Sequence, residues 1–403
     1  MSSTSARTIP TAVYWLALGA FAIGTEGFMI SPLLPGMASD LHVNIQTAGQ
    51  LVTVFALAYG LSSPVLTALA GSLNRRTLLL GSMTAFALSN LLAFSANTFL
   101  ELMAARALLA LSAGLFVPGS NALAGAIVAP ERRGRAIAVV NGGITIAIAL
   151  GVPLGAIVGH HLGWRSTFAG VAVLSAIAVF GVYIGIPKSI GEGIPTATLR
   201  ERIAVAARPA VLITLLSTTL WATGAYTVYT YLSPILASLT KATSYQISAV
   251  MFTWGIAAAA GVMTGGQLTD RVGPLRVIMP AILLMSAAFF SLSAEGHGHW
   301  DAWAPALLAI VVWGVAHWAF YPAQQARLIE IAGVKVAPIV LSLNASFMYI
   351  GFSLGAGLGG LTLAHRGVSS LGVVAGIAEI AAALVALGLA WTTSITQKTY
   401  PAA

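Results

Sequence analysis

Two ionisable side chains stand out because they lie in or beside long apolar stretches. Glu26 lies near the middle of the apolar segment 8–39, and Arg106 directly precedes a charge-free run. A charged group at the centre of a membrane helix costs about 2.5–3.5 kcal/mol on insertion scales, so such a residue is by default functional and faces a cavity. Burial favours the neutral acid, and hydration of a cavity favours proton release. We therefore expect Glu26 to carry a proton. The alternative is a permanently protonated glutamate that hydrogen-bonds a neighbouring helix.

Arg106 keeps its charge in proteins and carries five donors, so it needs a partner when it is buried. We expect this partner to be Glu26, a bound anion, or carbonyl and polar groups of facing helices. A purely structural clamp between helices is the alternative. Four residues lie roughly on the helical face of Arg106, and the small ones among them would let a partner approach: Ala110, Gly114, Val117 and Asn121.

The second half of the chain supplies aromatic and amide side chains instead of charges. Trp313, His317, Phe320 and Gln324 recur at helical spacing on one face. Flat rings with polar tips suit amphipathic, neutral or cationic solutes. Packing of helices against one another is the alternative for each of them, and His317 is either a core residue or a second protonation site. The expected substrate-binding set is Tyr226, Tyr229, Trp313, His317, Phe320, Gln324, Asn344, Phe347, Met348, Asn121 and Asn141.

Several other chemistries find little support. The chain has no cysteine, which excludes disulfides, thiolate catalysis and iron–sulfur clusters. No lysine with a following serine or threonine comes directly after the glycine-rich stretch 351–360, so we expect close helix packing there and no ATP site. The segment 295–301 contains metal-binding residue types but no second cluster, and we expect no metal and no cofactor. Glu379 is a second acid within an apolar segment, and its role stays open.

The elements that position these residues must be membrane helices. Of the 403 residues, 58% are hydrophobic and 7% are charged, and the mean hydropathy is +0.90, whereas soluble domains carry about 25% charged residues. A helix needs about 20 apolar residues to span a bilayer. Ten charge-free runs of at least 18 residues are long enough: 41–74, 77–100, 107–130, 136–164, 166–187, 209–240, 242–269, 277–294, 302–326 and 336–365. The segments 8–39 and 367–397 bring the expected number of spans to twelve.

Basic residues predict the orientation of these spans. Cytoplasmic loops are enriched in Lys and Arg. The two tails and the even-numbered connections hold fifteen of the 19 basic residues, whereas the odd-numbered connections hold Arg165, Lys241 and Arg366. Both termini are therefore expected in the cytoplasm. The net charge of +8 is spread over short loops on one membrane face, so it does not indicate nucleic-acid binding.

The two halves of the chain resemble each other. The residues 150–156 match 350–356, and the loop 70–76 matches 269–275. We expect two six-helix pseudo-repeats, with an N-terminal bundle at 1–187, a cytoplasmic linker at 188–208 and a C-terminal bundle at 209–403. Parallel repeats of this kind place a solute site between them near the bilayer midplane, where rocking gives alternating access.

The chain resembles the major facilitator superfamily over essentially its whole length. The segment 266–273, GQLTDRVG, is similar to the family's loop signature, which implies a cytoplasmic gating role for Gly266, Asp270, Arg271 and Gly273. Its N-terminal copy retains Arg75 and Arg76 but has Gly71, Ser72 and Asn74 where the pattern has acid, base and glycine. Arg106 is similar to the buried arginine of the fourth span. The motif of Gly151, Pro153 and Gly155 resembles the fifth-span helix-packing motif of the family's exporters.

The resemblance is closest to the bacterial drug/proton antiporter group, which includes sugar-efflux and chloramphenicol-efflux proteins. It implies a proton-coupled exporter of a small amphipathic or neutral molecule in the bacterial inner membrane, functional as a monomer and not an enzyme. A proton-coupled nutrient importer on the same fold is the first alternative. A membrane enzyme or sensor is the second, but no catalytic dyad is evident.

Overall fold

The computed structural model describes residues 9–188, 197–295 and 303–399, and these residues form helices and no strands. Eleven helices are long and apolar enough to cross a membrane. The number reaches twelve when the broken pair Thr11–Phe28 and Ile30–Asp40 counts as one span. The expected all-α membrane architecture is confirmed. The differences are breaks within two expected spans, 8–39 at Met29 and 209–240 at Thr230 and Tyr231.

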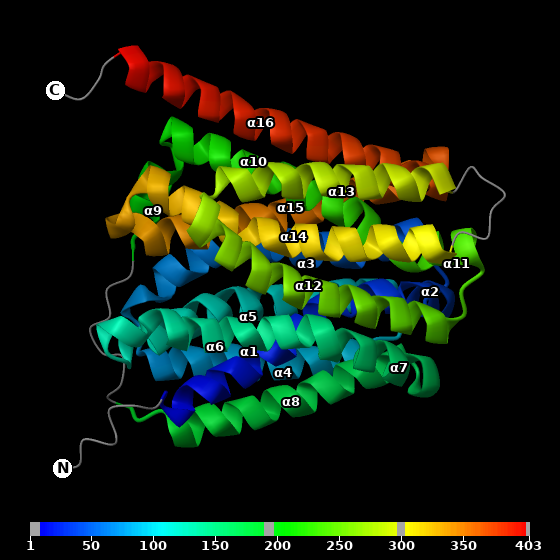
Figure 1. Cartoon of the computed structure of the whole chain (residues 1–403). Helices are drawn as coiled ribbons and strands as arrows, with labels where there is room; N and C mark the ends of the chain where they lie inside the picture. Colours follow the sequence, from blue (N-terminus) through cyan, green and yellow to red (C-terminus); the bar gives the residue numbers. More distant parts are fainter. Residues whose placement is uncertain (1–8, 189–196, 296–302, 400–403) are drawn as a thin grey trace. The chain divides into compact units, whose positions relative to one another are not determined.

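Packing divides the chain into two compact units, whose helices are labelled in Figure 1. The first comprises residues 1–29 and 65–198, and the second comprises 30–64 and 199–403. Helix α3 (Ile45–Leu69) therefore belongs mainly to the second unit. This division differs from the six-helix halves expected from the sequence because residues 30–64 pack on the second unit. The linker 188–208 is described only in part, since 189–196 lie outside the described residues.

The first unit is built from six helices: α1 (Thr11–Phe28), α4 (Arg75–Ser95), α5 (Phe99–Ala126), α6 (Arg133–Ile146), α7 (Val152–Leu162) and α8 (Trp164–Gly185). A π-helical turn, Ala147–Gly151, joins α6 to α7. Such turns interrupt the regular backbone hydrogen bonding and are frequent at functional sites. Glycines allow close approach here: an added Cβ at Gly143 would lie 2.2 Å from the carbonyl oxygen of Ala17. Helix α1 is thus clamped closely against α6.

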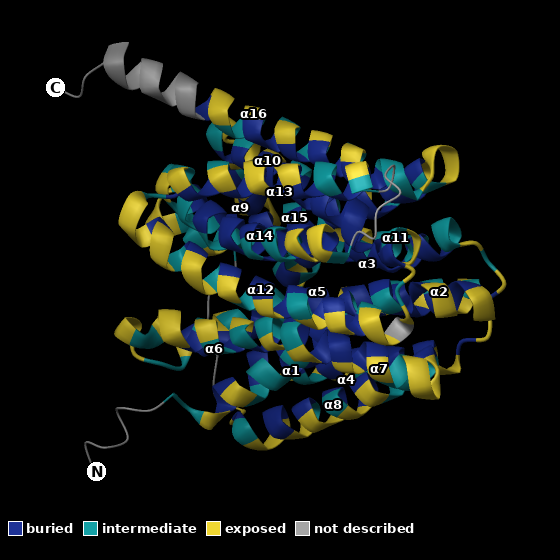
Figure 2. Cartoon of the chain, turned by 45° about the vertical axis from the view of Figure 1, so that its right-hand side comes forward, coloured by how far each residue is buried: buried dark blue, intermediate teal, exposed yellow. Residues whose placement is uncertain are grey.

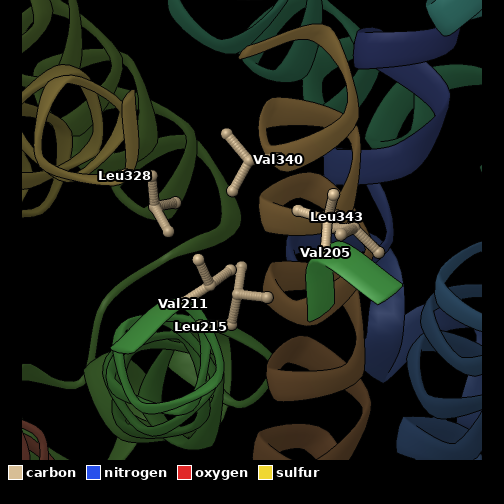
Figure 3. Packing of buried hydrophobic residues seen from close by; sticks show 6 residues of the cluster. All are labelled: Val205, Val211, Leu215, Leu328, Val340 and Leu343. Carbon is tan, nitrogen blue, oxygen red and sulfur yellow. The ribbon is translucent and has the colours of Figure 1, made fainter. Parts of the chain in front are cut away.

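The second unit contains the remaining helices: α2 (Ile30–Asp40), most of α3, α9 (Leu199–Ala206), α10 (Pro209–Tyr229), α11 (Leu232–Thr240), α12 (Ser244–Val272), α13 (Leu275–Glu295), α14 (Trp303–Ala332), α15 (Ala337–Arg366) and α16 (Leu371–Thr399). Helix α10 is buried on nearly all sides from Ser217 to Tyr229. An apolar cluster ties the short helix α9 to α10, α14 and α15 through Val205, Val211, Leu215, Leu328, Val340 and Leu343 (Figure 3).

Most other helices of the second unit bury only one stripe. On α16 the buried positions include Leu371, Ala375, Glu379 and Ala382, and the alternation of buried and exposed residues along the helix can be followed in Figure 2. Large apolar side chains lie on its other face, among them Ile377 at 57% exposure and Leu384 at 64%. A helix with one buried stripe and an apolar outer face is matched to a hydrocarbon surround, because no water is present there to penalise the exposed side chains.

Candidate functional site

The acid and base singled out in the sequence contact each other within the first unit. Arg106 on α5 donates from Nη1 to Oε1 of Glu26 on α1, and both side chains are fully buried. Glu26 Oε2 has no hydrogen-bond partner among the described residues. Of the partners expected for Arg106, the structure therefore shows Glu26. The two residues are 80 positions apart in the chain, so only the packing of α1 on α5 brings them together.

Glycines hold the segment of α1 that carries Glu26 against its neighbours. An added Cβ at Gly24 would lie 2.8 Å from the Cβ of Ala147, in the π-helical turn. An added Cβ at Gly151 would lie 2.1 Å from Thr25 Oγ1, and one at Gly155 would lie 3.5 Å from the Cβ of Met29. The motif that contains Pro153 thus packs against residues next to the acid, and Pro153 lies in the first turn of α7, directly after the π-helical turn.

Two asparagines join α5 to α6 in the same unit. Asn121 donates from Nδ2 to Oδ1 of Asn141 at 3.2 Å, and Asn141 is exposed. These are the two residues of the expected substrate-binding set that lie outside the second unit. Their mutual hydrogen bond leaves the amide of Asn141 exposed for further contacts.

The residues expected to form a gate occupy helix ends. Arg75 is buried at the start of α4. Arg76 donates from Nη2 to the backbone carbonyl oxygen of Tyr183 at 2.6 Å, and its guanidinium group lies over the aromatic ring of Tyr183. These contacts connect α4 to α8. Asn74 caps α4 by accepting from the backbone amides of Arg76 and Thr77, as asparagine does at helix N-termini.

The second copy of the loop signature ends helix α12. Gly266 lies in the last turns, Asp270 and Arg271 are exposed, and Gly273 terminates the helix with φ +84°. This backbone conformation favours glycine, because other residues place their Cβ atom against the backbone there. The need to end helix α12 in this conformation therefore explains the glycine at position 273. Within the described part of the chain, neither Asp270 nor Arg271 forms an ion pair with another residue.

Aromatic residues of α10 contact rings of neighbouring helices in two groups. Trp221 stacks on His317 at 4.2 Å and on Phe320 at 4.4 Å between ring centroids. Tyr226 stacks on Phe352 at 3.6 Å and contacts Tyr229 at 5.3 Å. His317 and Phe320 of the expected α14 stripe thus contact Trp221, whereas the tyrosine pair of α10 belongs to a second aromatic group.

Trp313 belongs to the group that contains the tyrosine pair. It packs against Trp254 and Phe289, each at 5.3 Å, and against Tyr229 at 6.3 Å. Trp313 is fully buried. In this conformation the Trp313 ring packs helices against one another, which is the alternative to a role in substrate binding.

The two amide residues of the expected set are joined through α10. Gln324 donates from Nε2 to Thr218 Oγ1 at 3.0 Å and to the carbonyl oxygen of Thr214 at 2.8 Å. Thr218 in turn donates to Asn344 Oδ1 at 2.8 Å. Asn344 Nδ2 has no hydrogen-bond partner among the described residues. This network connects α14, α10 and α15, and it leaves the Nδ2 group of the fully buried Asn344 unpaired.

Some aromatic residues of the second unit are not in the substrate-binding set expected from the sequence. Tyr59 on α3 stacks on Tyr349 on α15 at 3.8 Å, and Phe55 lies next to both. Tyr349, Tyr321 and Phe347 are partly exposed. The signal that could have found them is the one used for α14, since Phe55 and Tyr59 are four residues apart on one helical face. Met348 is buried.

No group of three or more His, Cys, Asp or Glu residues suited to a metal occurs in the described ranges. Most of the weak metal signal at 295–301 lies outside them.

Comparisons with known proteins agree with this architecture. The family model described as "Major Facilitator Superfamily" matches residues 16–237 and 214–402. An uncharacterized MFS-type transporter of Bacillus subtilis, YbcL, is 32% identical over 93% of this chain and 94% of its own length. A chloramphenicol resistance protein of Streptomyces lividans is 34% identical over 69% of this chain and 74% of its own length. The fold is similar to the crystal structure of a bacterial homolog of the human lysosomal transporter Spinster, with a TM-score of 0.72, 16% identity and coverage of 99% and 98% of the two chains.

Proposed function

Because this chain belongs to the major facilitator superfamily, we propose that it is a proton-coupled exporter of a small amphipathic or neutral molecule. It acts in the bacterial inner membrane by alternating access, with protons moving inward as the solute moves outward. The observation that carries this proposal is the fully buried pair of Glu26 and Arg106.

The pair links proton binding to helix packing. Removing one charge of a buried ion pair costs about 3–5 kcal/mol, because the other charge is left uncompensated. Protonation of Glu26 removes one charge in this way, so the contact between α1 and α5 becomes unfavourable and a rearrangement is favoured. A proton arriving at Glu26 thereby changes the structure of the unit that carries it.

The proton gradient supplies sufficient energy for this exchange. Moving one elementary charge across about 100 mV releases ~2.3 kcal/mol before any pH difference is added. A gain of about 1.4 kcal/mol corresponds to a factor of about ten in an equilibrium constant. One proton per cycle therefore supports substantial accumulation of an uncharged solute.

The aromatic residues of the second unit indicate the class of solute. Tyr321, Phe347 and Tyr349 are partly exposed aromatic residues, and Asn344 has a buried amide group without a partner in the same unit. Rings with a few polar groups bind amphipathic molecules. The similarity to a chloramphenicol resistance protein supports a neutral, aromatic probe molecule.

Everted membrane vesicles that contain the protein provide the test. Respiration acidifies their interior, and an exporter then accumulates chloramphenicol inside. We expect accumulation that a protonophore abolishes, and we expect Glu26→Gln to lower it at least about tenfold, because glutamine cannot exchange a proton. The exposed acid Glu131 provides the matched control, and Glu131→Gln should transport like the wild type.

Two results would contradict the proposal. Accumulation that survives both the protonophore and Glu26→Gln excludes proton coupling through this residue. Acid-driven loss of the probe from the vesicles, instead of its accumulation, identifies an importer.

A further inference from the structure

A second acid is buried in the second unit, where it has no charged partner among the described residues. Glu379 lies on the buried stripe of α16 and is fully buried. Neither of its carboxyl oxygens has a hydrogen-bond partner within the described ranges. Glu26, by contrast, has Arg106. The mechanism proposed above does not use Glu379.

The carboxyl group of Glu379 points at the backbone of α10. An added Cβ at Gly224 would lie 2.6 Å from Glu379 Oε1, so the group occupies space that exists because residue 224 is glycine. Two hydrogen bonds hold α16 on either side of this point. Ser217 donates to the carbonyl oxygen of Ala382 at 3.2 Å, and Ser286 donates to that of Gly376 at 3.0 Å. The position of the acid is therefore fixed by interlocked helices.

The helices packed against α16 bring no charged group of the described chain into hydrogen-bond contact with Glu379. Helices α10, α13 and α15 pack against it, and the described side chains of α16 include no other titratable group. The titratable or charged residues of the three helices are Tyr226, Tyr229, Arg276, Glu295, Tyr349, His365 and Arg366. None of them hydrogen-bonds Glu379, because both of its oxygens are without a partner.

An unpaired carboxylate at such a place is much less stable than the neutral acid. We propose that Glu379 is a second proton-binding site, separate from Glu26, so that each compact unit contains one proton-binding carboxyl group. The ligand is a proton, held on the carboxyl group beside Gly224 and exchanged with solvent. This inference goes beyond the proposed function, since it holds whether or not Glu26 couples transport.

Infrared spectroscopy of the purified full-length protein tests the proposal without a transported solute. A protonated carboxyl group has a carbonyl stretching band that is separate from the bands of carboxylates and amides. We expect a band at neutral pH that is present in the wild type and in Glu26→Gln, is missing from Glu379→Gln, and decreases at alkaline pH. Glutamine has nearly the shape of the neutral acid, so this variant should fold.

Two controls isolate the site. Glu131→Gln should leave the band unchanged, and Gly224→Ala should shift its frequency, because the added methyl group displaces the carboxyl group. The proposal is overturned if Glu379→Gln has the wild-type spectrum at every pH, which shows an ionised residue. It is equally overturned if the band does not change between acidic and alkaline pH, because the group then exchanges no proton.

Discussion

At the scale of single residues, buried polar groups connect helices in two ways. Glu26 and Arg106 form an ion pair. Thr218, by contrast, forms hydrogen bonds between uncharged groups, with the side-chain amides of Asn344 and Gln324. Interhelical hydrogen bonds in membrane proteins contribute about 0.6 kcal/mol on average and up to about 1.7 kcal/mol. Thr218 forms two of them, and it is therefore a point where one substitution should weaken the packing of three helices.

Thr218→Val tests this role. Valine keeps the shape of threonine but removes the hydroxyl, so Asn344 loses its donor and Gln324 retains only the carbonyl of Thr214. We expect a loss of about 1–3 kcal/mol in the free energy of unfolding, measured as a lower melting temperature in detergent. Thr264 bonds only carbonyls of its own helix, so Thr264→Val should change the melting temperature little. An unchanged melting temperature in Thr218→Val would show that the network contributes nothing to stability.

At the scale of elements, both units use glycines at the same spacing where two helices pack closely. Gly151 and Gly155 face Thr25 and Met29. Gly351 and Gly355, the matching residues of the second half, face the carbonyl oxygens of Thr219 and Thr223, each at 2.4 Å from an added Cβ. The internal repeat in the sequence therefore corresponds to a repeated way of packing helices. Of the two copies, the first lies beside the ion pair of Glu26 and Arg106.

Gly151→Ala should disturb that copy. The added methyl group would meet the β-branched side chain of Thr25, which has one or two favoured rotamers in a helix and cannot turn away freely. Overpacking of this kind costs about 1–3 kcal/mol, and the displacement of α1 moves Glu26. We expect several-fold lower chloramphenicol accumulation in everted vesicles together with a lower melting temperature.

Gly142→Ala is the matched control for this substitution, because nothing lies within 4 Å of an added Cβ there. It should transport like the wild type and unfold at the same or a slightly higher temperature, since alanine favours a helix by about 0.5–1 kcal/mol over glycine. Equal effects of the two substitutions would exclude a specific role for the contact with Thr25.

At the scale of the whole molecule, the distribution of basic residues predicts the orientation in the membrane. The absence of cysteine allows this prediction to be tested with single cysteines and no background. Gly134 and Lys241 are both exposed near the ends of expected spans, and they are expected on opposite membrane faces.

A membrane-impermeant maleimide should label Lys241→Cys in intact cells. It should label Gly134→Cys only in everted or permeabilised membranes. Labelling of both variants after permeabilisation is the control for accessibility. The reverse pattern in intact cells would place both termini outside the cytoplasm and contradict the orientation.

The sequence by itself determined the helical membrane architecture, the position of an acid within the first span and the aromatic face of α14. These features depend on hydropathy, charge and helical period, which are properties of the chain taken one segment at a time. It also left open whether Arg106 meets Glu26, an anion or carbonyl groups. The resemblance supplied the glycine motif that lies beside the acid.

Only the tertiary structure decided which faces meet. It paired Arg106 with Glu26, stacked Trp221 on two rings of α14, packed residues 30–64 with the second unit and set Glu379 against Gly224. Helix period fixes which side chains share a face, but the partner of that face depends on close packing between helices far apart in the chain. That packing is a property of the folded molecule as a whole, and no single segment contains it.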